Sequence, residues 1–423
     1  MADTGRALGA AYLAASRLLA PLAPVLLQRR LEQGREIPGR WREKLGEPGL
    51  PRPAGRLVWL HAVGLGETMA LRGLIAALET RAPDLAFLVT SSTRGSAEVF
   101  ARDMGATTRH QFLPLDIAPY WARFLDHWRP DLAIWSEQDL WPGAMFSAAK
   151  AGVPQALVNA RMNAHSYKKR RRLAPVYRAA LRQLALTDAQ DAATARHLAA
   201  LGAENVTVSG SLKPAGPPLG ADGAELARLQ ARLAGRRIWL AASSHPGDEA
   251  EALAALETAP AETLLILAPR FVERRGEIAA DLAARGLPCA QRSKGELPAA
   301  DTRVFLADTL GEMGLWYRLA EIALIGGGFR DAIGGHNPWE AVQLGCPVLH
   351  GPDTGNFRAD YAALDAAGAA RPVALGGLAA AMPPPAEAAE MAARARTLVG
   401  SAQTRVADLA ARLTAVMEAG PCR

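Results

Sequence analysis

Cysteine is scarce in this sequence. Its 423 residues include only Cys289, Cys346 and Cys422, which lie far apart and form no CxxC motif. A disulfide framework or a zinc site is therefore not expected, and a reducing cytosol suits the chain. The sequence also lacks a GxxxxGK[ST] phosphate loop, which argues against ATP hydrolysis.

Charged residues are also few, at 21% of the chain, whereas 50% of the residues are apolar. This balance provides enough apolar side chains for well-filled cores and argues against disorder. At 423 residues the chain is too long for one ordinary domain and fits two domains of roughly 150–200 residues each. The net charge of +6 and the pI near 9.5 favour anionic partners, namely phosphorylated substrates, acidic lipid surfaces or nucleic acid, and charge alone does not choose among them.

The amino-terminal stretch is almost wholly apolar or small from residue 7 to residue 28, broken only by Ser16 and Arg17, and it ends at Arg29 and Arg30. A spanning helix needs about 20 apolar residues, and a central arginine costs about 2.5–3.5 kcal/mol on insertion. The pattern therefore favours a helix that lies in the membrane interface, with the two arginines at anionic headgroups. A helix packed on its own domain is the alternative, and two prolines interrupt the stretch in either case.

Short apolar runs alternate with helical stretches from Leu57 onward, which is the rhythm of βα units and a parallel sheet. The segment Pro214–Gly220, with three prolines and two glycines, is the clearest linker. We therefore expect an α/β protein: a membrane-associating helix in residues 1–30, then two Rossmann-like domains, 31–213 and 214–423, that face each other across a cleft. The second domain is expected to include a helix from Glu387 to Glu418. The expected strands are Leu57–His61, Leu85–Thr90, Leu132–Trp135, Gln155–Val158, Ala185–Leu186, Ile238–Ala242, Leu264–Ala268, Val304–Ala307, Ile322–Ile325 and Pro347–Leu349.

Two glycine-rich turns occur in the second half. Gly326-Gly-Gly328 directly follows the strand Ile322–Ile325, and Gly334-Gly-His-Asn-Pro-Trp-Glu340 leads into an expected helix. Glycine lets the backbone approach a ligand, and a helix N-terminus offers free N–H groups to phosphate. Asn337 and Glu340 either contact a nucleotide, with Glu340 at the ribose, or cap the helix. The two turns together favour nucleotide binding.

Polar residues follow two more strands of the second half. Ser244-His245 comes after Ile238–Ala242, and Pro269-Arg270 comes after Leu264–Ala268. Because the carboxyl ends of parallel strands share one edge of the sheet, these residues and the glycine turns predict a pocket for a nucleotide monophosphate. Each signal alone is weak, since an arginine at a strand end is usually just solvated.

Acidic residues follow two strands of the first half. Glu67 comes just after a glycine-rich turn that follows Leu57–His61, and Glu137 and Asp139 follow Leu132–Trp135. A carboxylate in such a place can act as general base on an acceptor hydroxyl. It can equally stabilise a helix N-terminus through the helix dipole, or pair with one of the many arginines.

The densest basic run is Tyr-Lys-Lys-Arg-Arg-Arg at residues 167–172. It has three interpretations: a clamp for phosphate or headgroups, a nucleic-acid signal, or a solvated helix face. No RNP, zinc-finger or helix-turn-helix pattern accompanies it, so nucleic acid is not expected as a partner.

The chain carries an ordered series of short motifs: Gly34-Arg-Glu36, Arg42-Glu-Lys-Leu-Gly46, Trp59-Leu-His-Ala-Val-Gly-Leu-Gly-Glu67, Thr90-Ser-Ser-Thr-Arg-Gly95, Glu137-Gln-Asp-Leu-Trp-Pro142, Asn159-Ala-Arg161 with Ser166, Gly210-Ser-Leu-Lys213, Ser244-His-Pro-Gly-Asp-Glu249, Pro269-Arg270, Asp308-Thr-Leu-Gly-Glu-Met313, Gly334-Gly-His-Asn-Pro-Trp-Glu340 and Gly355-Asn-Phe357. In this order and spacing, the motifs resemble those of the Kdo (3-deoxy-D-manno-octulosonic acid) transferases, GT-B glycosyltransferases of lipopolysaccharide synthesis. The resemblance runs from about Gly34 to Asp360. No single motif is decisive, and the specificity lies in the ordered set.

The resemblance implies an inverting transfer of Kdo from CMP-Kdo to a lipid A precursor (lipid IVA), at the cytoplasmic face of a Gram-negative inner membrane. Residues 31–213 would bind the acceptor and 214–423 the CMP-sugar. Glu67 would be the general base, and Arg161, Lys213 and Glu137 would lie in the acceptor cleft. The donor would be bound by Ser244, His245, Pro269, Arg270, Gly311, Glu312, Met313, Gly335, Asn337, Glu340 and Asn356. Because backbone N–H groups and arginine can stabilise a leaving phosphate, neither metal nor cofactor is implied.

Four positions depart from the family's usual pattern. Gly64 and Gly328 stand where serine is common, Phe271 stands in place of a histidine, and Asp139 replaces a glutamate. These changes bear on single contacts and leave Glu67 untouched. Two other functions stay open: a GT-B enzyme that uses a UDP-sugar, and a non-catalytic nucleotide-binding protein at the membrane surface, for which Glu67 would be dispensable.

Overall fold

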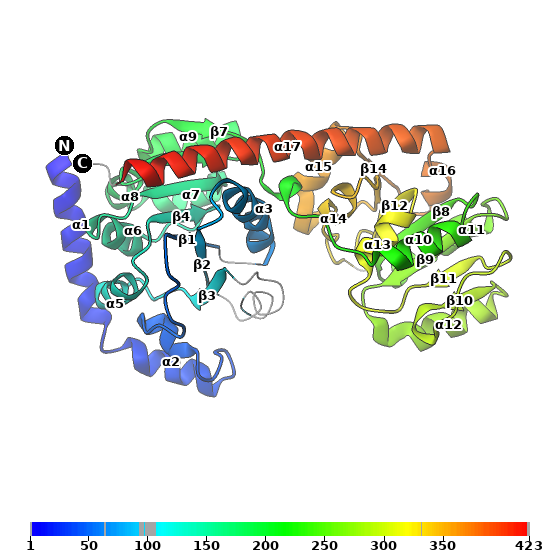
Figure 1. Ribbon diagram of the computed structural model, residues 1–423, viewed down its shortest axis with the longest axis horizontal. Helices are drawn as coiled ribbons and strands as arrows, with labels where there is room; N and C mark the ends of the chain where they lie inside the picture. The colour runs from blue at the N-terminus through cyan, green and yellow to red at the C-terminus, as the bar shows by residue number, and fades with distance from the viewer. Residues whose placement is uncertain (1, 63–64, 93–96, 98–106, 331, 421–423) are drawn as a thin grey trace. The chain divides into compact units, whose positions relative to one another are not determined.

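A computed structural model of the chain describes residues 2–62, 65–92, 97, 107–330 and 332–420 (Figure 1). It divides into two compact units. The first contains Met1–Gly216 and Ala402–Arg423, and the second contains Pro217–Ser401. Each unit has a seven-stranded parallel sheet with helices, so the α/β class and the Rossmann-like character predicted for both halves are confirmed. The boundary between the units falls inside the predicted linker.

The sheet of the first unit has the strand order β3-β2-β1-β4-β5-β6-β7. Its strands are β1 (Leu57–His61), β2 (Ala86–Ser91), β3 (Thr108–Phe112), β4 (Leu132–Ser136), β5 (Gln155–Ala160), β6 (Leu186–Ala189) and β7 (Val206–Val208). Its helices are α1 (Ala2–Ser16), α2 (Ala23–Glu32), α3 (Leu65–Arg81), α5 (Ala118–Trp128), α6 (Pro142–Lys150), α7 (Ala164–Arg171), α8 (Ala174–Leu181) and α9 (Ala192–Leu201). The strand order reverses between β1 and β4, and open α/β sheets bind ligands at this kind of switch point.

The sheet of the second unit repeats the plan, with the order β10-β11-β9-β8-β12-β13-β14. Its strands are β8 (Ile238–Ser244), β9 (Leu264–Pro269), β10 (Cys289–Gln291), β11 (Val304–Leu306), β12 (Ile322–Ile325), β13 (Val348–His350) and β14 (Ala370–Pro372). Its helices are α10 (Gly223–Arg232), α11 (Pro246–Glu257), α12 (Arg275–Ala284), α13 (Met313–Leu319), α14 (Trp339–Val342), α15 (Arg358–Ala366) and α16 (Leu378–Ala381). Helix α17 (Pro385–Ala419) belongs to this unit as far as Ser401. The corresponding switch point lies between β8 and β12.

Strand β1 shows why these apolar runs form central strands. All five of its residues are buried. Leu57 and Trp59 belong to the core cluster on one face of the sheet, and Val58 and Leu60 belong to the cluster on the other face. A strand covered by helices on both faces needs a continuous apolar run, which is the pattern of a parallel sheet.

Four strands were not predicted from the sequence: β3, β7, β10 and β14. All four lie at an edge of their sheet. Edge strands are short and partly polar because one side faces no partner strand, so their apolar pattern is weak. Strand β3, for example, reads Thr-Arg-His-Gln-Phe.

The carboxy-terminal helix differs from the expected domain plan, in which residues 214–423 form one domain. From Ala402 onward, α17 belongs to the first unit. Leu409 and Leu413 are buried there in one core cluster with Leu74 of α3. The apolar stripe of the helix is readable in the sequence, but which sheet the stripe covers depends on the tertiary structure.

The amino-terminal stretch forms α1 and α2, separated by a short 3-10 turn at Arg17–Leu19. Helix α1 packs on the first unit: the Tyr12 hydroxyl donates to Asp116 at 2.8 Å, and the Tyr12 ring contacts Phe146 edge-on. Within the described ranges no single helix has the length and hydropathy of a membrane span. One pair of helices meets both criteria when taken together: Gly5–Leu19 and Ala23–Glu32, which are bent by 55° relative to each other.

Candidate functional site

The first site is built at the switch point of the second sheet, where β8 and β12 end. The backbone N–H of His336 donates to Gly326 O at 3.1 Å, and that of Gly335 donates to Gly327 O at 2.8 Å, so the two glycine-rich turns pair. Arg270 N donates to Ser244 O at 3.0 Å, which adds the end of β9. The structure therefore brings together the turns and strand ends that the sequence predicted to meet.

Asp248, in the first turn of α11, organises this edge. Its buried carboxylate accepts the N–H of Gly327 at 2.7 Å and the N–H of His245 at 2.9 Å. Burial raises the pKa of Asp248, although these hydrogen bonds act against the rise. In the second glycine-rich turn, which begins at Gly334, the N–H of Gly334 donates to Asp353 at 3.1 Å. The N–H groups of Gly327 and Gly334 therefore already donate to carboxylates of the protein. A phosphate bound here would be contacted by side chains instead of these two N–H groups.

The glycines are also required for packing. A Cβ on Gly326 would lie 2.3 Å from Ser243 O, and a Cβ on Gly328 would lie 2.8 Å from Gly351 N. Either contact forces the backbone to shift. The departure at Gly328, where serine is common, therefore fits the close approach of the two chain segments here.

Two histidines face each other at the same edge. His245 Nε2 lies 2.8 Å from His336 Nε2, and the ring planes are inclined by 15° with their centroids 5.1 Å apart, so the two rings meet edge to edge. Burial, His245 and Arg270 lower the pKa of His336 to about 4. Phe271, which departs from the family pattern, contacts His245 edge-on and is 53% exposed. His336 was not among the predicted donor-site residues, although it lies inside one of the quoted motifs.

Asn337 and Glu340, expected at a ribose, also contact each other. Asn337 Nδ2 donates to Glu340 Oε1 at 3.4 Å, and Asn337 Oδ1 accepts the N–H of Trp339 at 3.1 Å. The alternative of helix capping is thus realised in part, and the helix is only four residues long. Burial raises the pKa of Glu340. Asn356 Nδ2 donates to Ile333 O at 2.6 Å, so this amide supports the glycine turn.

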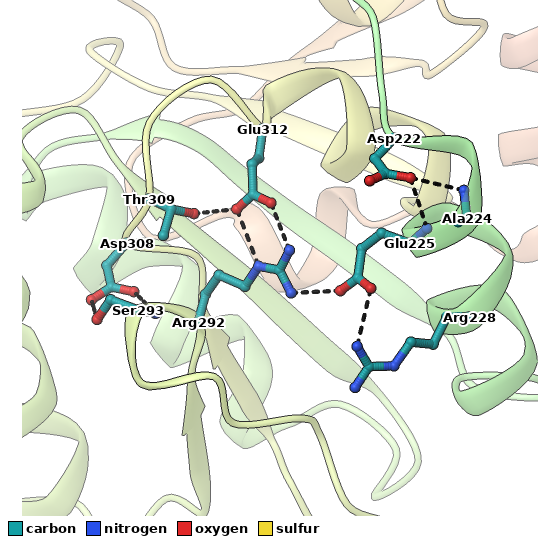
Figure 2. A network of polar contacts seen from close by, with 9 residues as sticks. All are labelled: Asp222, Ala224, Glu225, Arg228, Arg292, Ser293, Asp308, Thr309 and Glu312. Carbon is teal, nitrogen blue, oxygen red and sulfur yellow. Dashed lines mark hydrogen bonds and ion pairs between the residues drawn. The ribbon is translucent and has the colours of Figure 1, made fainter.

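Glu312 lies between Gly311 and the start of α13 at Met313. Figure 2 shows that ion pairs with Arg292 hold Glu312 and Glu225. The guanidinium of Arg292 donates to Glu312 at 2.6 and 3.1 Å and to Glu225 of α10 at 2.5 Å. Hydrogen bonding to Arg292 lowers the pKa of Glu312. The Glu312 carboxylate therefore anchors the loop that leads into α13. Glu312 would affect donor binding indirectly, through the conformation of this loop. Gly311 adopts the left-handed conformation with φ +87°.

The second site is the carboxyl edge of β4 and β5 in the first unit. Glu137 is buried and has φ +57°, a strained value for a residue with a side chain. Arg161 N donates to Glu137 O at 3.3 Å, and Leu212 N donates to Asn159 Oδ1 at 3.1 Å. The structure thus brings Glu137, Arg161 and the segment before Lys213 to one edge. Backbone strain of this kind gathers at functional sites.

His61 and Asp139 meet where β1 and β4 end. His61 Nδ1 lies 3.0 Å from Thr90 O, and His61 Nε2 lies 3.5 Å from Asp139 Oδ2. The shorter aspartate, where the family usually has glutamate, comes within ion-pair distance of the histidine, but these two atoms do not form a hydrogen bond. The pair lies at the switch point of the first sheet, beside the strand that leads to Glu67.

Glu67 lies in the first turn of α3, directly after β1, as the sequence predicted. Its side chain, Gly64 and part of the Thr90–Gly95 motif lie outside the described residues. The backbone position alone puts Glu67 at the same sheet edge as Glu137 and Asp139.

The basic run forms most of α7. Four of its residues end the helix: Lys168, Lys169, Arg170 and Arg171. The Arg170 guanidinium donates to the carbonyl of Gln138, so one cation of the run fixes the loop after β4. Among the described residues, no group of three His, Cys, Asp or Glu side chains is arranged to hold a metal ion.

Comparison with known proteins gives a consistent picture. Residues 39–215 match the family model described as 3-deoxy-D-manno-octulosonic-acid transferase (kdotransferase). The chain is 37% identical over 375 residues to the 3-deoxy-D-manno-octulosonic acid transferase of Bordetella pertussis, covering 85% of this chain and 86% of that protein. It is 33% identical over 346 residues to the transferase of that name from Rickettsia bellii, covering 81% and 82%.

Among solved structures, a glycosyltransferase from Rickettsia africae has a TM-score of 0.50, is 10% identical, and covers 86% of this chain and 99% of that chain. At this identity the likeness bears on the fold alone. The predicted GT-B fold, with two Rossmann-like domains, is confirmed.

Proposed function

Because the chain belongs to the 3-deoxy-D-manno-octulosonic acid (Kdo) transferase family, we propose that it moves Kdo from CMP-Kdo to a sugar hydroxyl of a lipid A precursor, lipid IVA. As a member of this family it is a glycosyltransferase that transfers Kdo. The observation that carries the proposal is the match to relatives over more than four fifths of both chains. The donor, the acceptor and the residue roles given below are part of the proposal.

The donor site is the switch point of the second sheet. CMP carries a phosphate, a ribose and a base, and this edge offers a cation, polar side chains and close backbone for them. Arg270 is exposed and forms no ion pair within the described part of the chain, so its guanidinium is available to the phosphate. Asn337 lies just before α14 and Glu340 lies in the first turn of that helix, and both would contact the ribose.

The acceptor site is the carboxyl edge of the first sheet. Glu67 would remove the proton from the acceptor hydroxyl, and the oxygen would attack the anomeric carbon of Kdo. The bond from that carbon to the phosphate oxygen breaks on the opposite face, its electron pair leaves with CMP, and configuration inverts. Arg161 and Lys213 would meet the anionic groups of the acceptor or of Kdo.

The test is to incubate purified protein with CMP-Kdo and a tetraacylated lipid A precursor. We expect release of CMP and an increase in acceptor mass by one or more Kdo units. An unchanged acceptor, together with no binding of CMP and binding of a UDP-sugar, would reject the proposed donor and reaction.

We also propose that the bend between α1 and α2 contacts an anionic membrane surface. Leu18, Leu22 and Leu26 are 80%, 66% and 56% exposed, and Arg17 and Arg29 are exposed beside them. The opposite face of α2 is buried on the first unit. Arg30 was expected at the headgroups but instead donates to Glu36 at 2.6 Å. Of the two neighbouring arginines, Arg29 would therefore contact the lipid headgroups.

Replacing both Leu18 and Leu22 with aspartate is expected to weaken binding to vesicles of anionic phospholipid by at least about 100-fold. Burying one leucine is worth about 1.5–3 kcal/mol, and about 1.4 kcal/mol corresponds to tenfold. Vesicle sedimentation measures the change. Leu375→Asp is the control, because Leu375 is 54% exposed in the second unit. Equal binding by the double variant and the wild type would show that this bend does not enter the membrane.

A further inference from the structure

The contact between His245 and His336 limits where their protons lie. Their Nε2 atoms are 2.8 Å apart, which is hydrogen-bond distance. Two neutral imidazoles can share such a contact only if one Nε2 carries a proton and the other accepts it. The accepting ring then carries its own proton on Nδ1. The pair therefore has one hydrogen bond between the two rings and one N–H group, on Nδ1 of the accepting ring, that points away from the other ring.

The start of α11 decides which ring donates. In the capping box there, the His245 ring faces the backbone N–H of Asp248 without forming a side-chain cap hydrogen bond, and the Asp248 carboxylate accepts the N–H of His245. Because His245 Nε2 faces His336, the ring atom on the side of the Asp248 N–H is Nδ1, and a ring nitrogen that faces an N–H donor carries no proton of its own. His245 thus carries its proton on Nε2 and donates it to His336 Nε2. His336 is left with a proton on Nδ1.

The N–H group of His336 is open to a ligand. No protein group in the described residues accepts from His336 Nδ1, and this atom is not among the buried polar atoms that lack a partner. The residue is held in place by its backbone: its N–H donates to Gly326 O at 3.1 Å, and its carbonyl accepts the Tyr361 hydroxyl at 2.8 Å. Arg270 is close enough to lower its pKa.

We propose that His336 donates a hydrogen bond from Nδ1 to the phosphate of the leaving CMP, and that His245 is the positioning residue that fixes this tautomer. The proposal rests on the proposed function for the identity of the donor. It names a catalytic group and a positioning residue in addition to the general base.

The chemistry balances without proton transfer from the ring. When the bond between the Kdo anomeric carbon and the phosphate oxygen breaks, the electron pair stays on that oxygen, and the phosphate gains one negative charge. A neutral imidazole N–H donates more strongly to this dianion than to the diester of the substrate. The pKa near 4 keeps His336 neutral at pH 7, and a neutral histidine is an effective electrophile in other enzymes. The contact thus favours the transition state over the ground state.

The experiment compares kinetic constants of the full-length enzyme and its variants. His336→Ala should lower kcat by about 10²–10³-fold, the usual effect of losing one such donor. The inhibition constant of CMP should weaken along with kcat, while KM for CMP-Kdo changes little, because only the product carries the extra charge. An unchanged kcat in a folded His336→Ala protein would overturn the proposal.

Amide substitutions test the tautomers. His336→Asn places an N–H near the position of Nδ1, whereas His336→Gln places it near Nε2, so the asparagine variant should be the more active. For His245 the order reverses: His245→Gln should be more active than His245→Asn. Equal activities within either pair would contradict the assignment, even if the alanine variant fails to fold.

Nitrogen-15 NMR of histidine-labelled wild type with CMP gives a reading independent of turnover. A proton on His336 Nδ1 and on His245 Nε2 is expected. A proton on His336 Nε2 would overturn the inference whether or not the protein transfers Kdo. Absence of transfer with the expected tautomers and bound CMP would count only against the proposed reaction.

Discussion

Replacement of Glu67 by glutamine is expected to lower kcat for Kdo transfer by about 10²–10⁴-fold, the usual contribution of a general base. The amide keeps the size of the side chain but cannot take the hydroxyl proton. CMP should bind the variant as it binds the wild type, because the donor residues belong to the other unit. Acceptor mass spectrometry measures transfer, and calorimetry measures CMP binding.

Glu79→Gln is the matched control for this variant. Glu79 lies near the other end of the same helix, α3, where its carboxylate accepts the Thr107 hydroxyl at 3.0 Å. Its replacement should leave kcat within about twofold of wild type, because Glu79 is remote along α3 from the sheet edge that holds Glu67. If both variants keep wild-type kcat, Glu67 is not the base, and the carboxylates after β4 become the candidates.

Asp116→Ala is expected to destabilise the first unit by about 3–5 kcal/mol. The Asp116 carboxylate accepts four hydrogen bonds: from the Tyr12 hydroxyl, from Trp121 Nε1, and from the backbone N–H groups of Gly143 and Ala144, at 2.8–3.1 Å. Each buried donor left without a partner costs about 1–3 kcal/mol. The same change releases the hydroxyl that holds α1. Urea unfolding followed by tryptophan fluorescence measures the loss.

The control is Asp126→Ala on the same helix, α5. Asp126 is exposed and forms no ion pair among the described residues, so its replacement should change stability by no more than about 0.5 kcal/mol. Binding of CMP by the second unit should survive Asp116→Ala at low urea. Equal unfolding midpoints for the two variants would show that the four hydrogen bonds do not stabilise the unit as argued.

Much of the fold was predictable because the central strands are covered on both faces. A strand such as β12, Ile322–Ile325, is wholly buried, and a short apolar run between helices is enough to predict it. The edge strands escaped prediction because their exposed side relaxes this pattern. Helix α17 was expected, yet its division between the units was not, since an amphipathic stripe does not name its partner.

The candidate donor site was predictable as a set of strand ends, but not in its internal bonding. Parallel strands place Ser244, Arg270 and Gly326 at one edge, and this follows from the order of apolar runs. The ion pair between Glu312 and Arg292 could not be predicted from the sequence. The two residues are 20 positions apart, and they meet only because β10 and β11 pair.

The sequence by itself determined the α/β class, the two halves, the strand ends that carry polar residues and, through the ordered motifs, the family. Only the tertiary structure decided which of those residues contact each other. The histidine pair is the clearest case: His245 and His336 are 91 positions apart, and their shared hydrogen bond exists because β8 and β12 are neighbours in the sheet. Local patterns specify elements, whereas a contact between distant residues depends on how the elements pair, and this is why the tautomer of His336 could be assigned only from the structure.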